Sequence, residues 1–434
     1  MKKARRAKDH IPEPKSQIPK GSATHPFARN YALDNLRSFL TALVIVHHTA
    51  IPYGGAGSWK IRSLCFPAES IALVIFNAVN QTFFMGLFFF LSGHFTRLQI
   101  SKRRIPLSTQ AYSRVWRLLL PAIVFTILVV PALEVMVRVS EYGFLEGQTT
   151  VLWEVYSSSW KHTYGIQGQV WYLALVFIFD LAAVLLPRVF DKSATQLLIS
   201  IFQRKRAFTS TAWITCILSS FAIRMVYPIG YLWSPLGLQL AFLPQYILAY
   251  TGGHLSVISD DYFILLPFQH SVSKPLRRLV TSIFSCLAIL GVTTALEKKL
   301  LGLDSSRVTS LMRGGFNIPA MIYATWNEMG FALIGFALLA VFLRHGNSPW
   351  RYGDIYLPRY SYGAFLVHPL ISLALELVLE PIMDCEGVGR SFHSLWALVG
   401  PVVMTLVVGV VNVFMSWIAA WVFITTIPYV GDII

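Results

Sequence analysis

The stretch LDNLRSFLTALVIVHHTAI, from Leu33 to Ile51, has the apolar length of a membrane-spanning helix and yet carries Arg37 near its start and His47 and His48 near its end. A charged group within a span costs about 2.5–3.5 kcal/mol on insertion scales, so it usually faces a protein interior and is a functional candidate. Arg37 and His48 are separated by about three helical turns and a rise of ~16 Å. They therefore share one helical face, either as a functional pair or as a structural pair, and His47 points elsewhere.

The composition is that of a membrane protein. The 434 residues are 55% hydrophobic and 13% charged, with a mean hydropathy of +0.57, whereas soluble domains carry about 25% charged residues. Apolar runs long enough to cross a bilayer core of ~30 Å account for most of the chain. They predict an all-α polytopic membrane protein with about ten transmembrane helices, near residues 33–51, 70–96, 116–137, 170–187, 210–227, 238–257, 279–296, 320–343, 361–379 and 395–427. Prolines and a Gly-Gly pair predict that the sixth span is broken or re-entrant.

The net charge of +15 has an explanation other than nucleic-acid binding. Lys and Arg are more than twice as numerous in the segments assigned to the side of the N-terminus as in those on the opposite side, which is the pattern of the positive-inside rule. We therefore expect both termini in the cytosol, with the membrane being either the endoplasmic reticulum or the plasma membrane. Residues 1–30 are basic, rich in Pro and Ser and without an apolar run, so we expect a disordered cytosolic tail.

Two further groups of residues lie near the cytosolic ends of the second and third spans. Gly86, Ser92 and Gly93 are small residues that permit close helix contacts, and either packing or a direct role would explain them. Arg114 and Arg117 lie three residues apart, and we expect them to share one helical face. They are either ordinary positive-inside charge or a clamp on phosphates, for which the guanidinium group is well suited.

Five segments, in this order along the chain, resemble the acyltransferase 3 family of integral membrane acyltransferases. They are RSFLTALVIVHH (Arg37 to His48), FFFLSGHF (Phe88 to Phe95), RVWRLLLP (Arg114 to Pro121), VWYL (Val170 to Leu173) and YSYGAFLVHP (Tyr360 to Pro369). The resemblance covers a transmembrane domain of residues 31–427. The basic tail and the absence of an appended soluble domain favour a fungal or other eukaryotic member.

The resemblance implies O-acyltransfer, most often O-acetylation, from cytosolic acyl-CoA to a hydroxyl of a small-molecule or glycan acceptor, without a metal. His48 is the expected general base, because an unperturbed imidazole titrates near pH 6.5. Arg37 is expected to assist it and to bind the donor, and Arg114 and Arg117 are expected to bind the donor at the entrance. The lipid bilayer, acyl-CoA and the acceptor are then the partners.

Weaker candidates remain. His368 matches the family's late histidine, but a buried, hydrogen-bonded histidine would explain it equally well. Glu328 is either an acceptor-side carboxylate or an interfacial residue, and we favour the interfacial interpretation. Cys65 and Cys385 both fall on the non-cytosolic side, where an oxidising lumen would allow them to form a disulfide.

Two other functions fit the same residues. A transporter or exporter of a hydrophobic or acylated molecule could use Arg37 and His48 as a substrate site or proton relay. Transfer to the nitrogen of an amino sugar is the alternative within enzymes. Hydrolysis of acetyl-CoA would distinguish an acyltransferase from a transporter.

Overall fold

The computed structural model describes residues 30–102, 106–142, 153–158, 165–189, 205–258, 261–265, 274–302, 305–380 and 389–428. Within these ranges the chain is almost entirely helical, which confirms the all-α class. The described sheet is an antiparallel pair, β1 (Arg351–Tyr352) and β2 (Ile355–Tyr356). The main helices are α1 (Tyr31–Ala50), α2 (Ile71–Lys102), α3 (Leu107–Arg114), α4 (Leu120–Val124), α5 (Val130–Tyr142), α7 (Trp171–Val189), α9 (Lys205–Val226), α10 (Leu243–Ser256), α11 (Pro275–Leu301), α12 (Ser305–Arg313), α13 (Ile318–Gly330), α14 (Phe336–His345), α15 (Ser361–Leu379) and α16 (Gly389–Thr426). Residues 1–29 of the predicted tail lie outside the described residues.

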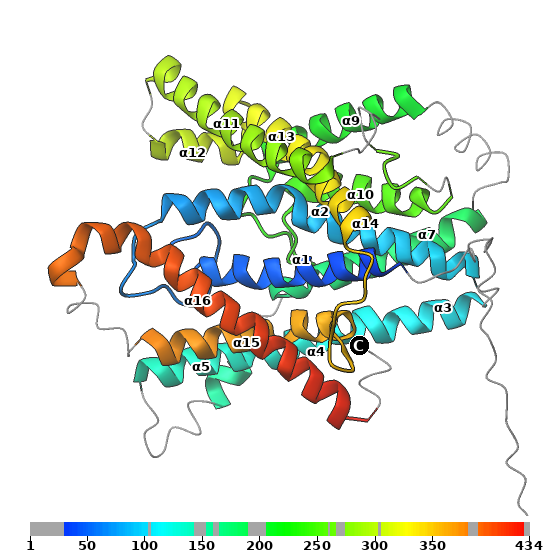
Figure 1. Ribbon diagram of the computed structural model, residues 1–434, viewed down its shortest axis with the longest axis horizontal. Helices are drawn as coiled ribbons and strands as arrows, with labels where there is room; N and C mark the ends of the chain where they lie inside the picture. The colour runs from blue at the N-terminus through cyan, green and yellow to red at the C-terminus, as the bar shows by residue number, and fades with distance from the viewer. Residues whose placement is uncertain are drawn as a thin grey trace, which may run out of the picture.

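Helix α1 runs through the middle of the bundle, in contact with α2, α14, α15 and α16 (Figure 1). We call the end of the bundle where α1 begins the near face and the end where α1 finishes the far face. The side chain of Asn30 caps α1 by accepting a hydrogen bond from the Ala32 N–H. The buried Asn35 side chain donates to the backbone carbonyls of Gly346 and Ser348. Polar residues are tolerated in this helix because neighbouring segments of protein supply partners for them.

Eight helices in the described part of the chain are long and apolar enough to cross a membrane. They coincide with eight of the predicted spans. The other two predicted spans are α1, which carries Asp34, Arg37 and two histidines, and α10, which has 14 residues. The protein is thus an all-α polytopic membrane protein whose most polar predicted span is enclosed by other helices.

The chain between α9 and α10 is irregular, as predicted for a broken span. Trp233 and Leu238 form an isolated antiparallel bridge, the Ser234–Pro235 peptide is cis, and the Ile166 N–H donates to the Pro235 carbonyl. Such backbone is tolerated at membrane depth only where protein or water surrounds it.

Helices α2 and α10 pack closely where both carry glycine. A Cβ atom on Gly93 would lie 2.1 Å from the Tyr250 carbonyl oxygen, and one on Gly253 would lie 1.8 Å from the Phe90 carbonyl oxygen. Only glycine fits at both positions, so the packing interpretation of Gly93 is supported.

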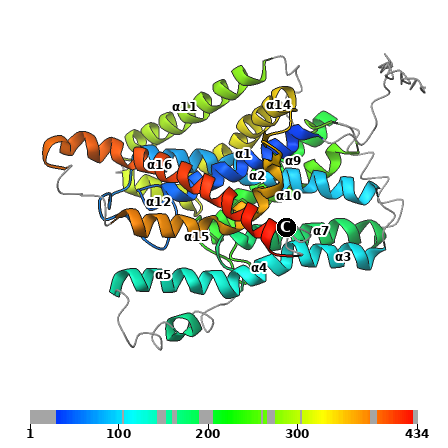
Figure 2. The same cartoon turned by 60° about the horizontal axis from the view of Figure 1, so that its bottom comes forward.

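The third predicted span is one continuous run in which α3, α4 and α5 are joined by two π-helical turns (Figure 2). These are η1 (Val115–Leu119) and η2 (Phe125–Val129). A π-turn shifts the backbone hydrogen bonds from i+4 to i+5 and changes the direction of the side chains that follow, and it often lies at a functional site. The first of these turns begins directly after Arg114 and contains Arg117.

Candidate active site

His48 of α1 and His368 of α15 form a hydrogen-bonded pair although 320 residues separate them. Nδ1 of His48 lies 2.9 Å from Nε2 of His368. Their rings are parallel to within 2° with centroids 5.2 Å apart, so the two rings meet edge to edge in one plane. Nδ1 of His368 lies 2.7 Å from the Phe365 carbonyl oxygen. His368 is fully buried and His48 is partly buried.

These contacts assign the protons of the neutral pair. The Phe365 carbonyl can only accept, so Nδ1 of His368 carries a proton and Nε2 of His368 carries none. Nδ1 of His48 then donates to His368. Nε2 of His48 is left with its lone pair available, which is the state that a general base requires.

Trp59 covers the far-face side of His48. Its indole ring lies 6.2 Å from the His48 ring at an angle of 15°, and its Nε1–H donates to Oε2 of Glu376 at 2.6 Å. The Ser372 hydroxyl donates to the other oxygen of Glu376. His368, Ser372 and Glu376 are spaced four residues apart on α15 and therefore form one polar stripe. Sequence reasoning missed Trp59 and Glu376, although a carboxylate within a span was a detectable signal.

Residues 51–70, which we call the strap, connect α1 to α2 and contact α5 and the C-terminal end of α15. Lys60 pairs with Glu134, and the Ser63 hydroxyl donates to Glu380. Cys65 is disulfide-bonded, whereas Cys216 and Cys286 are free and buried. Cys385, the chain's remaining cysteine, lies outside the described residues. The disulfide at Cys65 agrees with the predicted pairing of Cys65 with Cys385.

Arg37 lies near the other end of α1, on the near-face side. Its guanidinium is 3.6 Å from Asp34, donates to the Pro358 carbonyl at 3.3 Å, and lies over the ring of Phe95 at 5.8 Å. About a third of the side chain is exposed (36%), which leaves it accessible. His47 points elsewhere, as predicted: it is buried and stacks on Phe84.

Three of the sequence segments meet between these two ends of α1. The Ser92 hydroxyl lies 2.7 Å from the Tyr172 hydroxyl, and the Tyr172 ring contacts Phe365 at 6.1 Å. Phe365 in turn contacts His368. Ser92 thus belongs to a chain of contacts that leads to the histidine pair. Tyr172 is a further functional candidate that its VWYL segment did not single out.

Arg114 and Arg117 do not share a face, contrary to the sequence prediction. Arg114 is buried and paired with Asp180 of α7, whereas Arg117 is exposed. The π-turn that follows Arg114 and contains Arg117 accounts for the difference, because it turns Arg117 away from the direction expected in a regular helix. Asp180 was missed, although an aspartate within an apolar span is a signal of this kind.

Glu328 is enclosed by protein and does not lie on an exposed surface. Its side chain is fully buried and accepts hydrogen bonds from Ser220, Cys216 and Asn327. The buried Arg224 lies nearby, with its guanidinium between the rings of Phe242 and Tyr323. The sequence did not indicate this neighbour, because the two charges are on different helices.

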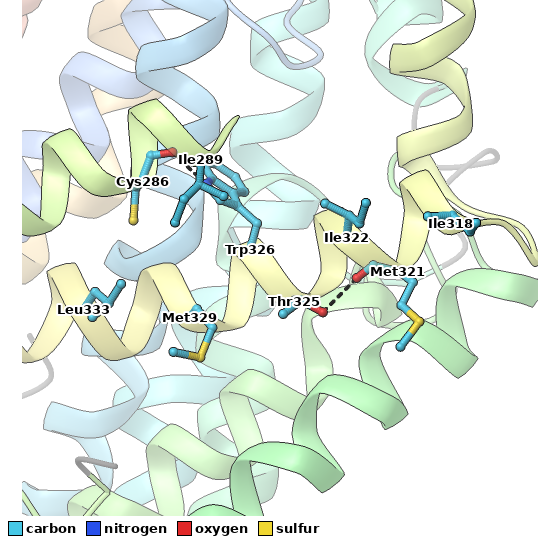
Figure 3. A pocket seen from close by; sticks show the side chains of 9 residues that line it. All are labelled: Cys286, Ile289, Ile318, Met321, Ile322, Thr325, Trp326, Met329 and Leu333. Carbon is cyan, nitrogen blue, oxygen red and sulfur yellow. Dashed lines mark hydrogen bonds between the residues drawn. The ribbon is translucent and has the colours of Figure 1, made fainter. Parts of the chain in front are cut away.

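An apolar pocket of about 330 Å³ lies between α11 and α13, away from the histidine pair (Figure 3). The residues that line it are Cys286, Ile289, Ile318, Met321, Ile322, Thr325, Trp326, Met329 and Leu333. Trp326 donates to the Cys286 carbonyl across it. No charged side chain lines this pocket, so it offers no group for proton transfer.

In the described part of the chain, no group of three or more His, Cys, Asp or Glu residues could hold a metal ion.

The structure describes a polytopic membrane protein with a hydrogen-bonded histidine pair in its interior, and comparison with known proteins gives its class. The model of the acyltransferase 3 family, described as "Acyltransferase domain", matches residues 30–421 of the 434. The chain therefore belongs to this family of membrane acyltransferases, as its motifs indicated. Searches among curated proteins and among solved structures found no match.

Proposed function

We propose that the protein transfers an acyl group, in the first place acetyl, from acyl-CoA to a hydroxyl of a small-molecule or glycan acceptor. The observation that carries the proposal is the available lone pair on Nε2 of His48, which follows from the hydrogen bonds to His368 and Phe365. Family membership favours an acyltransferase over the transporter alternative.

The proposed reaction uses His48 as base and then as acid. Nε2 of His48 takes the proton of the acceptor hydroxyl while the hydroxyl oxygen attacks the thioester carbonyl carbon. The carbon–sulfur bond breaks, and the departing thiolate of CoA takes the proton from His48. Throughout, the Nδ1–H of His48 donates to His368, which fixes the ring and stabilises the imidazolium. His368 remains neutral, because two adjacent buried positive charges would repel each other.

The donor is proposed to enter from the near face, and we propose that this face is cytosolic. Arg37 is partly exposed and lies about 16 Å from His48 by helix rise. It is within reach of an extended pantetheine arm whose thioester is at the histidine. Two other donor-binding candidates remain in the third span. Arg114 lies directly before its first π-turn, and Arg117 lies within that turn.

The test uses purified protein in detergent with acetyl-CoA and no acceptor. We expect slow release of free CoA and a rise in the unfolding temperature with CoA at ~1 mM, the upper end of common KM values. Unreacted CoA should inhibit the hydrolysis. A folded protein that neither releases CoA nor is stabilised by it would contradict the proposed donor.

A further inference from the structure

Arg114 is the centre of a buried hydrogen-bond cluster that joins four helical segments. Its Nε donates to Oδ2 of Asp180 at 3.1 Å. The other carboxylate oxygen accepts from the Thr96 hydroxyl of α2 and the Tyr250 hydroxyl of α10, each at 2.7 Å. Its Nη1 donates to the Gln110 carbonyl within α3, and its buried Nη2 has no hydrogen-bond partner among the described residues. Every oxygen of the carboxylate is thus used, and the pair carries no net charge.

A neutralised and buried arginine is a poor ligand for phosphate. The attraction that a phosphate would gain from the Arg114 guanidinium is largely cancelled by the Asp180 carboxylate beside it. Taking such a pair apart to bind a ligand leaves a buried carboxylate without its partner, which is costly. The arrangement is suited to anchoring a helix.

Arg117 differs from Arg114 in both its exposure and its ion pairing. Its side chain is exposed, and among the described residues no carboxylate forms an ion pair with it. Its backbone, in contrast, is held: the Tyr362 hydroxyl of α15 donates to the Arg117 carbonyl at 2.6 Å. The turn is therefore fixed on one side by Arg114 and Asp180 and on the other by Tyr362.

From these contacts we infer that Arg117 alone of the two arginines binds the donor's phosphates. Arg114 with Asp180, and Tyr362 from the opposite side, are positioning residues that fix the π-turn and direct Arg117. The inference deepens the proposed function and rests on it. It divides the predicted two-arginine clamp into one binding residue and one anchor.

The experiment compares CoA with pantetheine, which has the same amide arm and no phosphate. Binding of each is measured by thermal shift and by inhibition of acetyl-CoA hydrolysis, at low and high salt. We expect Arg117→Gln to weaken the binding of CoA about tenfold, which is the scale of one charged hydrogen bond. Pantetheine should be unaffected, and the salt dependence of CoA binding should diminish.

The anchor is tested by the charge-neutral double variant Arg114→Gln with Asp180→Asn. If it folds, it should lose part of its preference for CoA over pantetheine, because it disturbs the positioning of Arg117 without removing a phosphate ligand. Arg114→Lys, which keeps the pair with Asp180, is the second variant and should retain the preference. The exposed pair Arg138 and Glu141, changed to Gln and Gln, is the matched control. Loss of the CoA preference in Arg114→Lys, with none in Arg117→Gln, would overturn the assignment.

Positioning by Tyr362 is tested in a double-mutant cycle. Tyr362→Phe should weaken the binding of CoA several-fold in the wild-type background and have no further effect on it in the Arg117→Gln background. Equal effects in both backgrounds would overturn the positioning role. A wild-type protein that binds neither CoA nor pantetheine would remove the proposed function itself, whereas binding of CoA with the variant pattern reversed would remove the inference alone.

Discussion

At the scale of single residues, the account depends on the hydrogen bond between His48 and His368. Replacing His368 by Leu removes the acceptor for the His48 Nδ1–H, so we expect kcat to fall about tenfold or more with little change in the KM for acyl-CoA. His368→Gln, whose amide oxygen can accept the same hydrogen bond, should retain most of the activity. Equal losses in both variants would indicate a packing role.

A second residue-scale prediction concerns the buried charges of Arg224 and Glu328. Arg224→Met removes a buried cation that acts electrostatically on Glu328 without a direct ion pair among the described residues, and the buried Glu328 carboxylate loses that compensation. We expect a large fall in the unfolding temperature. Adding Glu328→Gln should recover much of it, because the second change removes the unpaired charge. A double variant less stable than Arg224→Met would contradict this coupling.

The sequence predicted the site unevenly at this scale. Arg37 and His48 could be found because charge in an apolar span is costly, and His368 because its segment matched the family. The contacts of Arg114 could not be found, because Asp180 is distant in sequence and the π-turn was not anticipated, although Pro121 just after it lacks the N–H that would donate to the Arg117 carbonyl. The same limit applied to Glu328, whose burial depends on α9.

At the scale of helices, the glycine contact between α2 and α10 can be tested directly. Gly253→Ala would place its Cβ 1.8 Å from the Phe90 carbonyl oxygen, so the helices must separate. We expect a loss of about 1–3 kcal/mol, measured by thermal unfolding. Gly291→Ala on α11 is the matched control, because nothing lies within 4 Å of its added Cβ and alanine favours a helix. Equal effects would refute close packing as the cause.

Helix positions themselves were predictable, because a bilayer selects apolar runs of nearly fixed length. The break before α10 was also predictable from its prolines. The polar character of α1 was visible in the sequence, but its enclosure by α2, α14, α15 and α16 required the structure.

At the scale of the whole molecule, the strap places Cys65 at the far face. If Cys65 pairs with Cys385, the protein should resist a membrane-impermeant maleimide until it is reduced. Cys385→Ser should free Cys65 and allow its labelling from the non-cytosolic side alone. Labelling of Cys65 in the unreduced wild type would contradict the predicted pairing. Labelling from the cytosolic side would contradict the predicted orientation.

The central claim is that His48 is the base of an acyl-CoA-dependent transfer, and one measurement tests it most directly. Acetyl-CoA hydrolysis and CoA-induced stabilisation are measured together in the wild type and in His48→Ala. We predict that the variant loses at least about a hundredfold in turnover, the usual contribution of a general base, while CoA still stabilises it. Wild-type turnover in a folded His48→Ala variant would contradict the account.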